Sequence, residues 1–516
     1  MQRRSYFSPF LWFSLPIGAF FIVVILVLPA SNDLFVHAAT LAQLRENFWA
    51  PSDPMVNEPG LGNPYFSPYM VFWSVVAKLA AIDTFNVLRL GAIVNLVLFM
   101  SGFNAFVKTM STNRYAPVFA LLCTFFIWGT GFFYWSGFVS FPSLILSIGY
   151  PSTFAVGAGL WVWVLLTKII AVDRTRLGLV VYTALAAILG SAVLLSHQFT
   201  ALGVCIYAGI YIVRNAKSLD RGSLLSFAAI ATSVCAFVAV WPWYDLFDAT
   251  GGVDGFNAVH KPLYEDLVRR YSLLLLTVPV LIYRLRKDWG DPLVYTIVIC
   301  LSVFVYGGVT ENFYLARIFP PVALLSQIAL GIAIATWIRD RGCRLKRSFA
   351  FLGCTAIIGG IVFQSGFINV ISPGNYPVAL DATFGSRMPK GDYKWMTEHI
   401  GFGESIMTRD WDARAMAPGY GRFTVMAAWP DPFLGDEEKI RREDTREFFK
   451  NNTDPSRRAE LMEKYGAQWV VLRQADVHLV ESDKAFRWVA ERPDGGAREE
   501  DLERGRAQLY EYVPQK

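Results

Sequence analysis

Directly after an apolar run from Phe10 to Pro29, the chain reads Ser31-Asn32-Asp33-Leu34-Phe35-Val36-His37 and continues to Asn47. A run of about 20 apolar residues can cross a bilayer, so it predicts a retained membrane helix that delivers this stretch to the far side. In a helix over residues 33–47, Asp33 and His37 lie one turn apart on one side. A carboxylate beside an imidazole suits a general base and its partner. The alternative is that Asp33 only caps a surface helix by accepting a backbone N–H.

The composition is that of a membrane protein with a soluble part attached. Of the 516 residues, 54% are hydrophobic and only 17% are charged, and the mean hydropathy is +0.37. Soluble domains carry about 25% charged residues. The net charge of +5 is small, and the basic residues are spread over many short loops, which argues against nucleic-acid binding. The six cysteines show no CxxC pair and no metal-ligand spacing, so they indicate neither a disulfide framework nor a zinc site.

Ten further apolar stretches follow the first, which predicts about eleven membrane spans in an α-helical polytopic protein. These stretches cover 84–107, 116–138, 151–171, 177–195, 198–214, 223–241, 271–285, 291–309, 315–337 and 348–368. The segment 67–82 is shorter and contains Lys78, so we expect a helix that lies at the membrane interface or dips into it.

The distribution of Lys and Arg predicts the orientation. Counting eleven spans, the basic loops all fall on the side of Arg3 and Arg4, which marks that side as cytoplasmic. We therefore expect a multi-pass protein of the inner (plasma) membrane with its N-terminus in the cytoplasm. The first outer loop, 30–83, and the C-terminal tail face outward.

The tail changes character near residue 373, where charges become dense and long apolar runs end. It predicts two regions: a transmembrane domain over 1–372 that includes the first outer loop, and an extracytoplasmic α/β domain over 373–516. Short strands are expected at 404–408, 423–429, 467–473 and 508–513, and helices at 391–400, 435–450 and 455–465. The tail has no phosphate-binding glycine loop and no nucleophile elbow.

Several polar residues lie at the outer ends of the spans. His197 occupies the joint between two spans, and His260 and Lys261 lie in the outer loop 241–270. Each can be read simply as a polar residue at the water line. Glu311 precedes the span expected over 315–337, and Arg317 lies at the outer end of that span. Ionisable groups at this boundary are costly and are more often functional. The planar guanidinium of Arg317 would suit the oxygens of a phosphate. The alternative is that Glu311 and Arg317 form a structural ion pair.

This layout resembles the C-type (GT-C) membrane glycosyltransferases, which use polyprenyl-phosphate sugars. The similarity includes Asp33-x-x-x-His37, Phe48-Trp49-Ala50-Pro51 and Asn63-Pro64-Tyr65-Phe66-Ser67-Pro68-Tyr69, which resemble loops of bacterial members of unassigned specificity. Asp33 matches the family's acidic residue in the first outer loop. Several members carry a second, adjacent acid, whereas this chain has Asn32 there, so a metal-binding form of the site is not indicated.

The resemblance implies transfer of a sugar from a polyprenyl-phosphate donor to a cell-envelope glycan, lipid or protein on the outer face. Asp33 would be the catalytic base and His37 would orient it or bind acceptor. The residues implied for the substrate and its lipid phosphate are His197, His260, Lys261, Glu311, Tyr314 and Arg317. No cofactor is implied, and a divalent cation is left open.

Three other functions remain as alternatives. The nearest is a lipid-linked glycan polymerase or ligase, for which we expect a long outer loop late in the series rather than first. A transporter or flippase for a lipid-linked saccharide should carry charged residues in mid-span and paired broken helices. A non-catalytic membrane protein with a sensor domain would tolerate alanine at Asp33 and Arg317.

Overall fold

The computed structural model describes residues 8–28, 33–60, 62–131, 133–249, 254–364, 393–493 and 506–514. The chain divides into two compact units. Unit 1 is drawn from 1–29, 89–241 and 257–371, and unit 2 from 30–88, 242–256 and 372–516. The first outer loop therefore packs with the tail in unit 2, whereas the sequence analysis assigned it to the transmembrane domain. The boundary expected near residue 373 lies outside the described residues.

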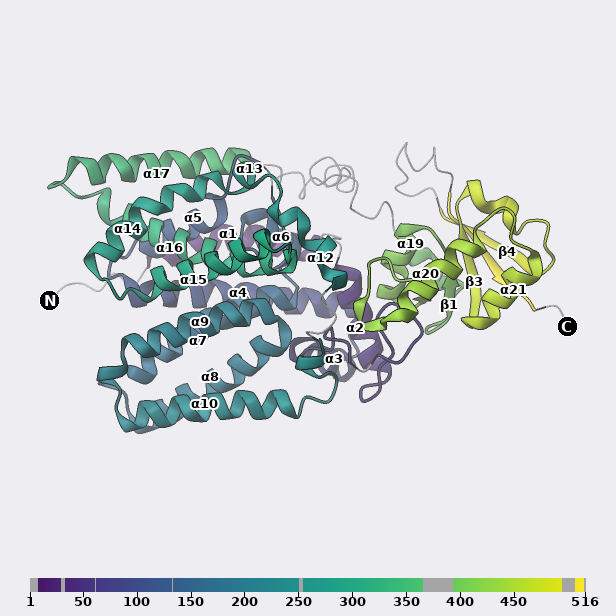
Figure 1. Ribbon diagram of the computed structural model, residues 1–516, viewed down its shortest axis with the longest axis horizontal. Helices are drawn as coiled ribbons and strands as arrows, with labels where there is room; N and C mark the ends of the chain where they lie inside the picture. The colour runs from purple at the N-terminus through teal and green to yellow at the C-terminus, as the bar shows by residue number, and fades with distance from the viewer. Residues whose placement is uncertain are drawn as a thin grey trace. The chain divides into compact units, whose positions relative to one another are not determined.

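Unit 1 is all helical (Figure 1). Its long helices are α1 (Pro9–Val27), α4 (Thr84–Met110, which begins in unit 2), α5 (Ala116–Phe126), α7 (Pro151–Ile170), α8 (Arg176–Ser196), α9 (Gln198–Arg214), α10 (Arg221–Ala239), α14 (Val278–Lys287), α15 (Pro292–Val309), α16 (Phe319–Trp337) and α17 (Arg344–Phe363). Short helices connect them: α6 (Phe141–Ser147), η1 (Ala216–Ser218), α12 (Asp254–His260), η2 (Lys261–Tyr264), α13 (Leu267–Tyr271), η3 (Ser272–Thr277) and η4 (Phe313–Ile318).

Eight helical segments in the described part of the chain are long and apolar enough to cross a membrane. Helices also occupy the other three stretches among the eleven expected spans. The helix expected over 116–138 ends early, at Phe126, whereas the one expected over 198–214 has the predicted bounds and 17 residues. The stretch 271–285 begins as the 3-10 helix η3 and becomes α-helical only at Val278, next to Pro279, which has no N–H to donate.

Past Phe126, side chains and backbone from other segments take over the hydrogen bonds that a helix would have made. The amide of Gln327 donates to the carbonyl of Ile127 at 2.7 Å, and that of Gln364 donates to Gly131 at 2.9 Å. The N–H of Gly131 donates to the carbonyl of Arg269 at 2.9 Å. Irregular backbone is tolerated at membrane depth only where protein surrounds it, so this segment belongs to the interior of unit 1.

Burial separates a central helix from lipid-facing ones. The span that contains α16 is 94% buried, whereas those of α1, α8, α10 and α17 are 17–22% buried although they too are apolar. Apolar side chains turned outward suit a hydrocarbon solvent. In unit 1, α5 packs on α16, and α8 packs between α7 and α10 (Figure 1).

Unit 2 begins with two helices that the sequence predicted, α2 (Leu34–Glu46) and α3 (Pro68–Ala80). Between them runs an irregular loop with a single β-bridge between Ser52 and Pro59. The short helix α11 (Leu246–Ala249) belongs to the same unit. In α3, Phe72, Val75 and Leu79 are exposed on one face while Trp73 and Ala77 are buried, which fits the expected interfacial helix.

The tail folds as an α/β domain around a five-stranded sheet of order β2-β1-β3-β5-β4. The strands are β1 (Ser405–Met407), β2 (Phe423–Thr424), β3 (Ala467–Leu472), β4 (Phe486–Glu491) and β5 (Gln508–Tyr512). β1 is parallel to β2 and β3, and β5 is antiparallel to β3 and β4. Val470 pairs with Tyr510 in the β3–β5 register. The sequence predicted four of these strands and missed β4, and β2 is shorter than expected.

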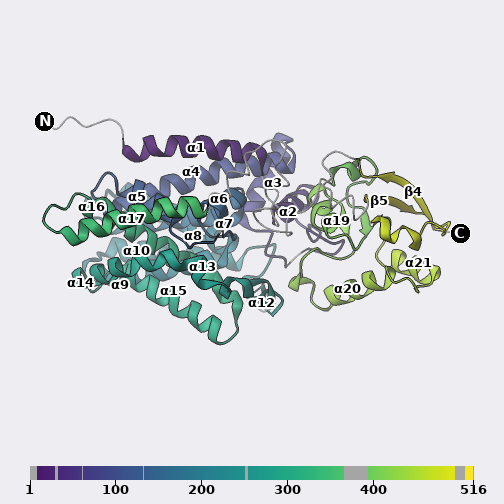
Figure 2. The same cartoon turned by 90° about the horizontal axis from the view of Figure 1, so that it is seen from above.

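Helices α20 (Asp436–Phe448) and α21 (Pro455–Lys464) cover one face of this sheet (Figure 2). Their buried Phe448, Leu461 and Met462 pack on Val470 and Leu472 of β3. The helix expected over 391–400 is only a 3-10 turn, η6 (Lys394–Glu398). The remaining elements are α19 (Trp411–Met416), η7 (Ala417–Tyr420), η8 (Pro432–Leu434) and η9 (Gln474–Leu479).

Candidate functional site

Helix α2 carries the first pair of candidate residues. Asp33 is its N-cap residue and is half-buried, but its carboxylate makes no capping hydrogen bond to the helix. The cap interpretation therefore does not account for this side chain. The N–H of His37 donates to the carbonyl of Asp33 at 3.0 Å, so the two residues lie one helical turn apart as predicted.

Burial decides the charge of His37. Every residue of α2 from Leu34 to Leu44 is buried, and the His37 ring is only 6% exposed. This burial lowers the pKa of His37 to about 3, so the imidazole is neutral at physiological pH. A neutral ring can orient a carboxylate or accept a hydrogen bond, but it does not form an ion pair with Asp33.

A chain of hydrogen bonds in the first outer loop positions the side chain that packs on His37. Buried Asp53 accepts the N–H groups of Met55 and Val56 at 2.8 and 3.1 Å. Its other oxygen accepts the amide of Asn63 at 2.9 Å.

Asn63 in turn accepts the N–H of Tyr65 at 3.0 Å. The Tyr65 ring meets the His37 ring edge-on, with centroids 5.9 Å apart. We did not single out Asp53 from the sequence, because a lone aspartate in a loop carries no signal until its donors are known.

Within unit 2, α2 and the first outer loop pack on the tail. Phe35, Phe85 and Tyr420 form an aromatic cluster with centroids 5.2–6.1 Å apart. A Cβ at Gly419 would lie 2.7 Å from the Phe35 ring, so only glycine permits this approach. The N–H of Thr424 donates to the carbonyl of Met55 at 3.1 Å, which joins loop to sheet.

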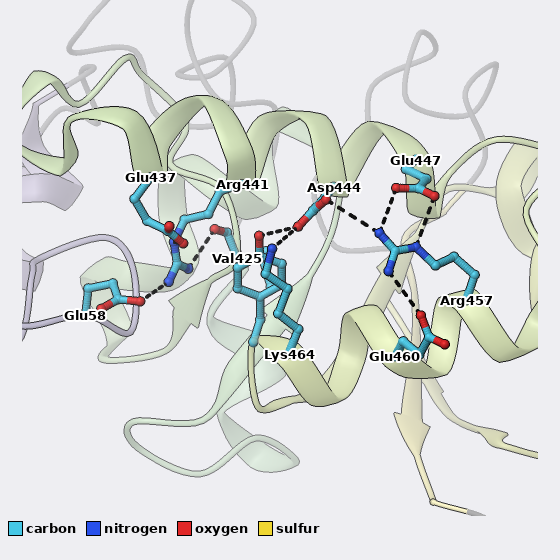
Figure 3. A network of polar contacts seen from close by, with 10 residues as sticks. Glu58, Val425, Glu437, Arg441, Asp444, Glu447, Arg457, Glu460 and Lys464 are labelled. Atoms are coloured by element: carbon cyan, nitrogen blue, oxygen red, sulfur yellow. Dashed lines mark hydrogen bonds and ion pairs between the residues drawn. The ribbon is translucent and has the colours of Figure 1, made fainter.

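An ion-pair network reinforces this junction (Figure 3). Arg441 of α20 is buried, pairs with Glu58 of the loop and with Glu437, and donates to the carbonyl of Val425. Two acids lie in the same region. Burial raises the pKa of Asp53, and it raises that of Asp431 to about 7, with the charge of Asp53 as the second cause.

Unit 1 contains the second group of candidates, and its centre is a pair formed by Arg317 and His197. Arg317 Nη2 lies 2.6 Å from His197 Nε2, and His197 Nδ1 lies 2.7 Å from the hydroxyl oxygen of Thr200. A guanidinium has only donors, so Nε2 is the acceptor. This assignment puts the ring proton on Nδ1, facing the Thr200 hydroxyl at 2.7 Å, and leaves the Thr200 backbone N–H, 3.3 Å from the same Nδ1, without an acceptor there.

The surroundings keep His197 neutral. Burial lowers its pKa well below the ordinary value, and the charge of Arg317 and the nearby His260 lower it further. Gly137 has φ of +83°, and a Cβ there would lie 3.1 Å from the His197 ring and 3.7 Å from Arg317 Nη2. This glycine lets the irregular segment after α5 pass close to the pair.

The other predicted residues of unit 1 gather around η2 and η4, which pack together. His260 is buried against Trp135, with ring centroids 6.0 Å apart. Lys261 is exposed, and its Nζ lies 6.0 Å from the Phe313 ring centroid. Tyr314 is held through its backbone N–H, which donates to Asn257 at 3.3 Å.

Glu311 does not act as the partner of Arg317. Its side chain is exposed, and its carbonyl accepts the Asn257 amide at 2.7 Å. Within the described residues, no ion pair joins Glu311 to Arg317. The structural Glu–Arg pair considered as an alternative is therefore absent there, and Arg317 is held by a neutral imidazole instead.

An apolar hollow adjoins the Arg317–His197 pair. It is lined by α7, α9 and the start of α16, and Gly137 and Thr200 connect it to the pair. Most of the lining is aliphatic, including Val156, Leu160 and Leu324. A cation at the edge of an apolar hollow suits a ligand with an anionic head and a hydrocarbon body.

The structure thus brings together His197, His260, Lys261, Glu311, Tyr314 and Arg317 in unit 1, and Asp33 and His37 in unit 2. Asn32, the residue in the position of a second acid, lies outside the described residues. Across the part of the chain that the structure describes, no group of three or more His, Cys, Asp or Glu could hold a metal ion.

Sequence reasoning missed a further cation in unit 1. Arg270 lies with its guanidinium 5.5 Å from the Phe133 ring centroid. It follows Arg269 in the outer loop 241–270, and the signal that could have found it is this pair of adjacent basic residues in an outer loop.

Comparison with solved structures identifies the fold. The chain is similar to the oligosaccharyltransferase of Archaeoglobus fulgidus (TM-score 0.52, 12% identity, 99% of this chain and 75% of that one). It is also similar to the arabinofuranosyltransferase AftD from Mycobacteria (0.56, 13%, 98% and 40%) and to ArnT from Cupriavidus metallidurans (0.51, 11%, 98% and 100%). No protein-family model matches the chain, and no curated protein matches it in sequence.

These neighbours are polytopic membrane glycosyltransferases. The chain therefore has the GT-C fold, as the resemblance in its first outer loop indicated. At 11–13% identity the similarity concerns the fold, and the chemistry has to be argued from the residues.

Proposed function

We propose that this protein is an integral membrane glycosyltransferase that moves a sugar from a polyprenyl-phosphate donor to a cell-envelope glycan, lipid or protein. Two neighbours support the donor class: one ArnT structure is bound to undecaprenyl phosphate, and one archaeal oligosaccharyltransferase structure contains a dolichol-phosphate and an inhibitory peptide. The observation that carries the proposal is Arg317, which is held by neutral His197 beside an apolar hollow.

In the proposed reaction, the acceptor hydroxyl oxygen attacks the anomeric carbon of the donor sugar. Its proton passes to the carboxylate of Asp33, a general-base role of the kind that typically contributes about 10²–10⁴-fold in rate. The bond from the anomeric carbon to the phosphate oxygen breaks, and the polyprenyl phosphate leaves with the electron pair. Arg317 stabilises the charge that develops on this phosphate.

The remaining residues take supporting roles. His197 is a positioning residue, because it orients the guanidinium of Arg317 without neutralising it. Lys261 and His260 are further candidates for the phosphate, and His37 orients Asp33 or binds acceptor. The reaction as proposed takes place on the extracytoplasmic face, with the N-terminus in the cytoplasm.

The test is Asp33→Asn in the full-length protein, assayed with a polyprenyl-phosphate sugar as donor. We expect a loss of activity of about 10²–10⁴-fold with an unchanged melting temperature, since only the proton acceptor is removed. Glu46→Gln, at the other end of the same helix, is the matched control and should retain activity. Near wild-type turnover of Asp33→Asn would mean that the base is another residue.

A further inference from the structure

Unit 2 also buries Arg414, which forms no ion pair with any carboxylate among the described residues. Arg414 lies on α19 and is 8% exposed. Its Nη1 donates to the carbonyl of Ala427 at 3.2 Å, while its Nε has no partner within the described residues. No ion pair to Arg414 occurs in that part of the chain either. A buried guanidinium without a balancing charge is costly, and no carboxylate among the described residues pairs with this one.

The carboxylate of Asp410, whose charge acts on Arg414, already has other partners. One of its oxygens accepts the hydroxyl of Tyr393 at 2.9 Å and the N–H of Ala413 at 2.8 Å. It also pairs with Arg473.

A second guanidinium approaches the same short stretch, Met426–Trp429. Nη1 of Arg442 lies 3.8 Å from the sulfur of Met426, next to the residue whose carbonyl binds Arg414. Arg442 pairs through Nε with Glu438, and its Nη2 has no partner among the described residues. The two arginines lie close enough for their charges to interact: burial lowers the pKa of Arg414 to about 10, and Arg442 contributes to this shift.

Two half-buried indoles belong to the same two segments as these contacts. Trp411 begins the helix that carries Arg414, and Trp429 ends the stretch on which both guanidiniums lie. Their rings meet edge-on with centroids 5.5 Å apart. Indole faces pack against the apolar C–H faces of sugar rings, and guanidinium forks bind carboxylate or phosphate oxygens in a bidentate manner.

We propose that Arg414, Arg442, Trp411 and Trp429 form a binding site for an anionic saccharide on the α/β unit. The carboxylate or phosphate of the ligand binds the two guanidiniums, and its ring stacks on an indole. This site concerns recognition alone, and it stands whether or not the chain transfers sugar.

Calorimetric titration of the full-length protein in phosphatidylcholine nanodiscs tests the site. The probes are glucuronate, glucose 1-phosphate and neutral glucose, so that the first two distinguish a carboxylate from a phosphate ligand. We expect one of the two anions to bind at least tenfold more tightly than glucose. Equal binding of all three probes, or no binding of either anion, would overturn the proposal.

Variants assign the binding to these residues. Arg414→Gln should weaken anion binding at least tenfold, with a melting temperature that is unchanged or higher because a buried charge is removed. Arg442→Gln should weaken it less, because Glu438 already shares that charge. The matched control is Arg487→Gln, an exposed arginine of β4 paired with Glu511, which should bind like wild type.

If Arg414→Gln does not fold, Arg414→Lys is used in its place. The lysine keeps the positive charge but lacks the bidentate guanidinium. Partial loss of anion binding in the folded Lys variant supports the site. Retention of full anion affinity in whichever of the two variants folds overturns it.

Discussion

Arg317 in unit 1 and Arg441 in unit 2 are held in opposite ways. Arg441 is 4% exposed in its side chain and pairs with two carboxylates, Glu58 and Glu437. Arg317 contacts a neutral imidazole, and no ion pair joins it to Glu311 within the described residues. Carboxylates that pair fully with an arginine hold its side chain in place and neutralise its charge. A neutral partner orients a charge without neutralising it.

The same contrast separates the two arginines of the α/β unit. Arg441 connects the first outer loop to α20, so its role is structural. Arg414 binds one carbonyl and no described carboxylate, which is why we assign it to a ligand. The nature of the partner, more than burial, thus distinguishes a structural arginine from a binding one.

The largest effect on stability should come from removing Arg441. Arg441→Gln leaves Glu58 and Glu437 without their partner, and we expect a loss of about 2–3 kcal/mol in the free energy of unfolding of unit 2. This is less than the roughly 3–5 kcal/mol of a fully buried pair, because the two carboxylates are 37% and 38% exposed. Denaturant unfolding measures it, with exposed Lys439→Gln as the control. A loss below about 0.5 kcal/mol would contradict the structural role.

A smaller effect, on donor binding alone, is expected for Arg317. Arg317→Lys keeps the charge but loses the planar fork, so the KM for a polyprenyl-phosphate sugar should rise about tenfold. The melting temperature should stay within a few degrees of wild type, because the positive charge is kept. Asp173→Asn, at an exposed position between α7 and α8, is the control and should change neither quantity. If Arg317→Lys lowers only the melting temperature, Arg317 is structural and Lys261 is the next candidate for the phosphate.

The smallest effect should be a pH dependence of the stability of unit 2. The folded-state pKa of Asp431 is about 7, raised above the unfolded value of 3.8 by burial and by Asp53. Stability from this group is therefore fully present below about pH 4 and is lost as the pH rises toward about 7. Asp431→Asn, which cannot ionise, should reduce this decline in melting temperature between pH 5 and pH 8. Exposed Asp436→Asn should not, and an unchanged decline in Asp431→Asn would exclude Asp431 as its source.

Local patterns predicted most elements correctly where a single physical signal dominated. Length and hydropathy identified the long spans, and the helices α2, α20 and α21 begin and end within a few residues of their predicted positions. β4 was missed although Phe486-Arg487-Trp488 alternates in polarity as a strand does. The helix predicted over 116–138 ended early because side-chain amides of Gln327 and Gln364, distant in sequence, satisfy the backbone after Phe126.

For the candidate site too, some features follow from local sequence and others only from the tertiary structure. The sequence by itself determined a polytopic membrane protein, an acid with a histidine one turn later, and an arginine at the outer end of a span, because hydropathy and helical spacing act over a few residues. Only the tertiary structure decided which of these groups are charged and which are compensated. His37 is neutral because the surrounding fold buries it, His197 accepts from an arginine 120 residues away, and Arg441 is paired while Arg414 is not. Desolvation and ion pairing depend on neighbours that are remote in the chain, and local sequence does not encode them.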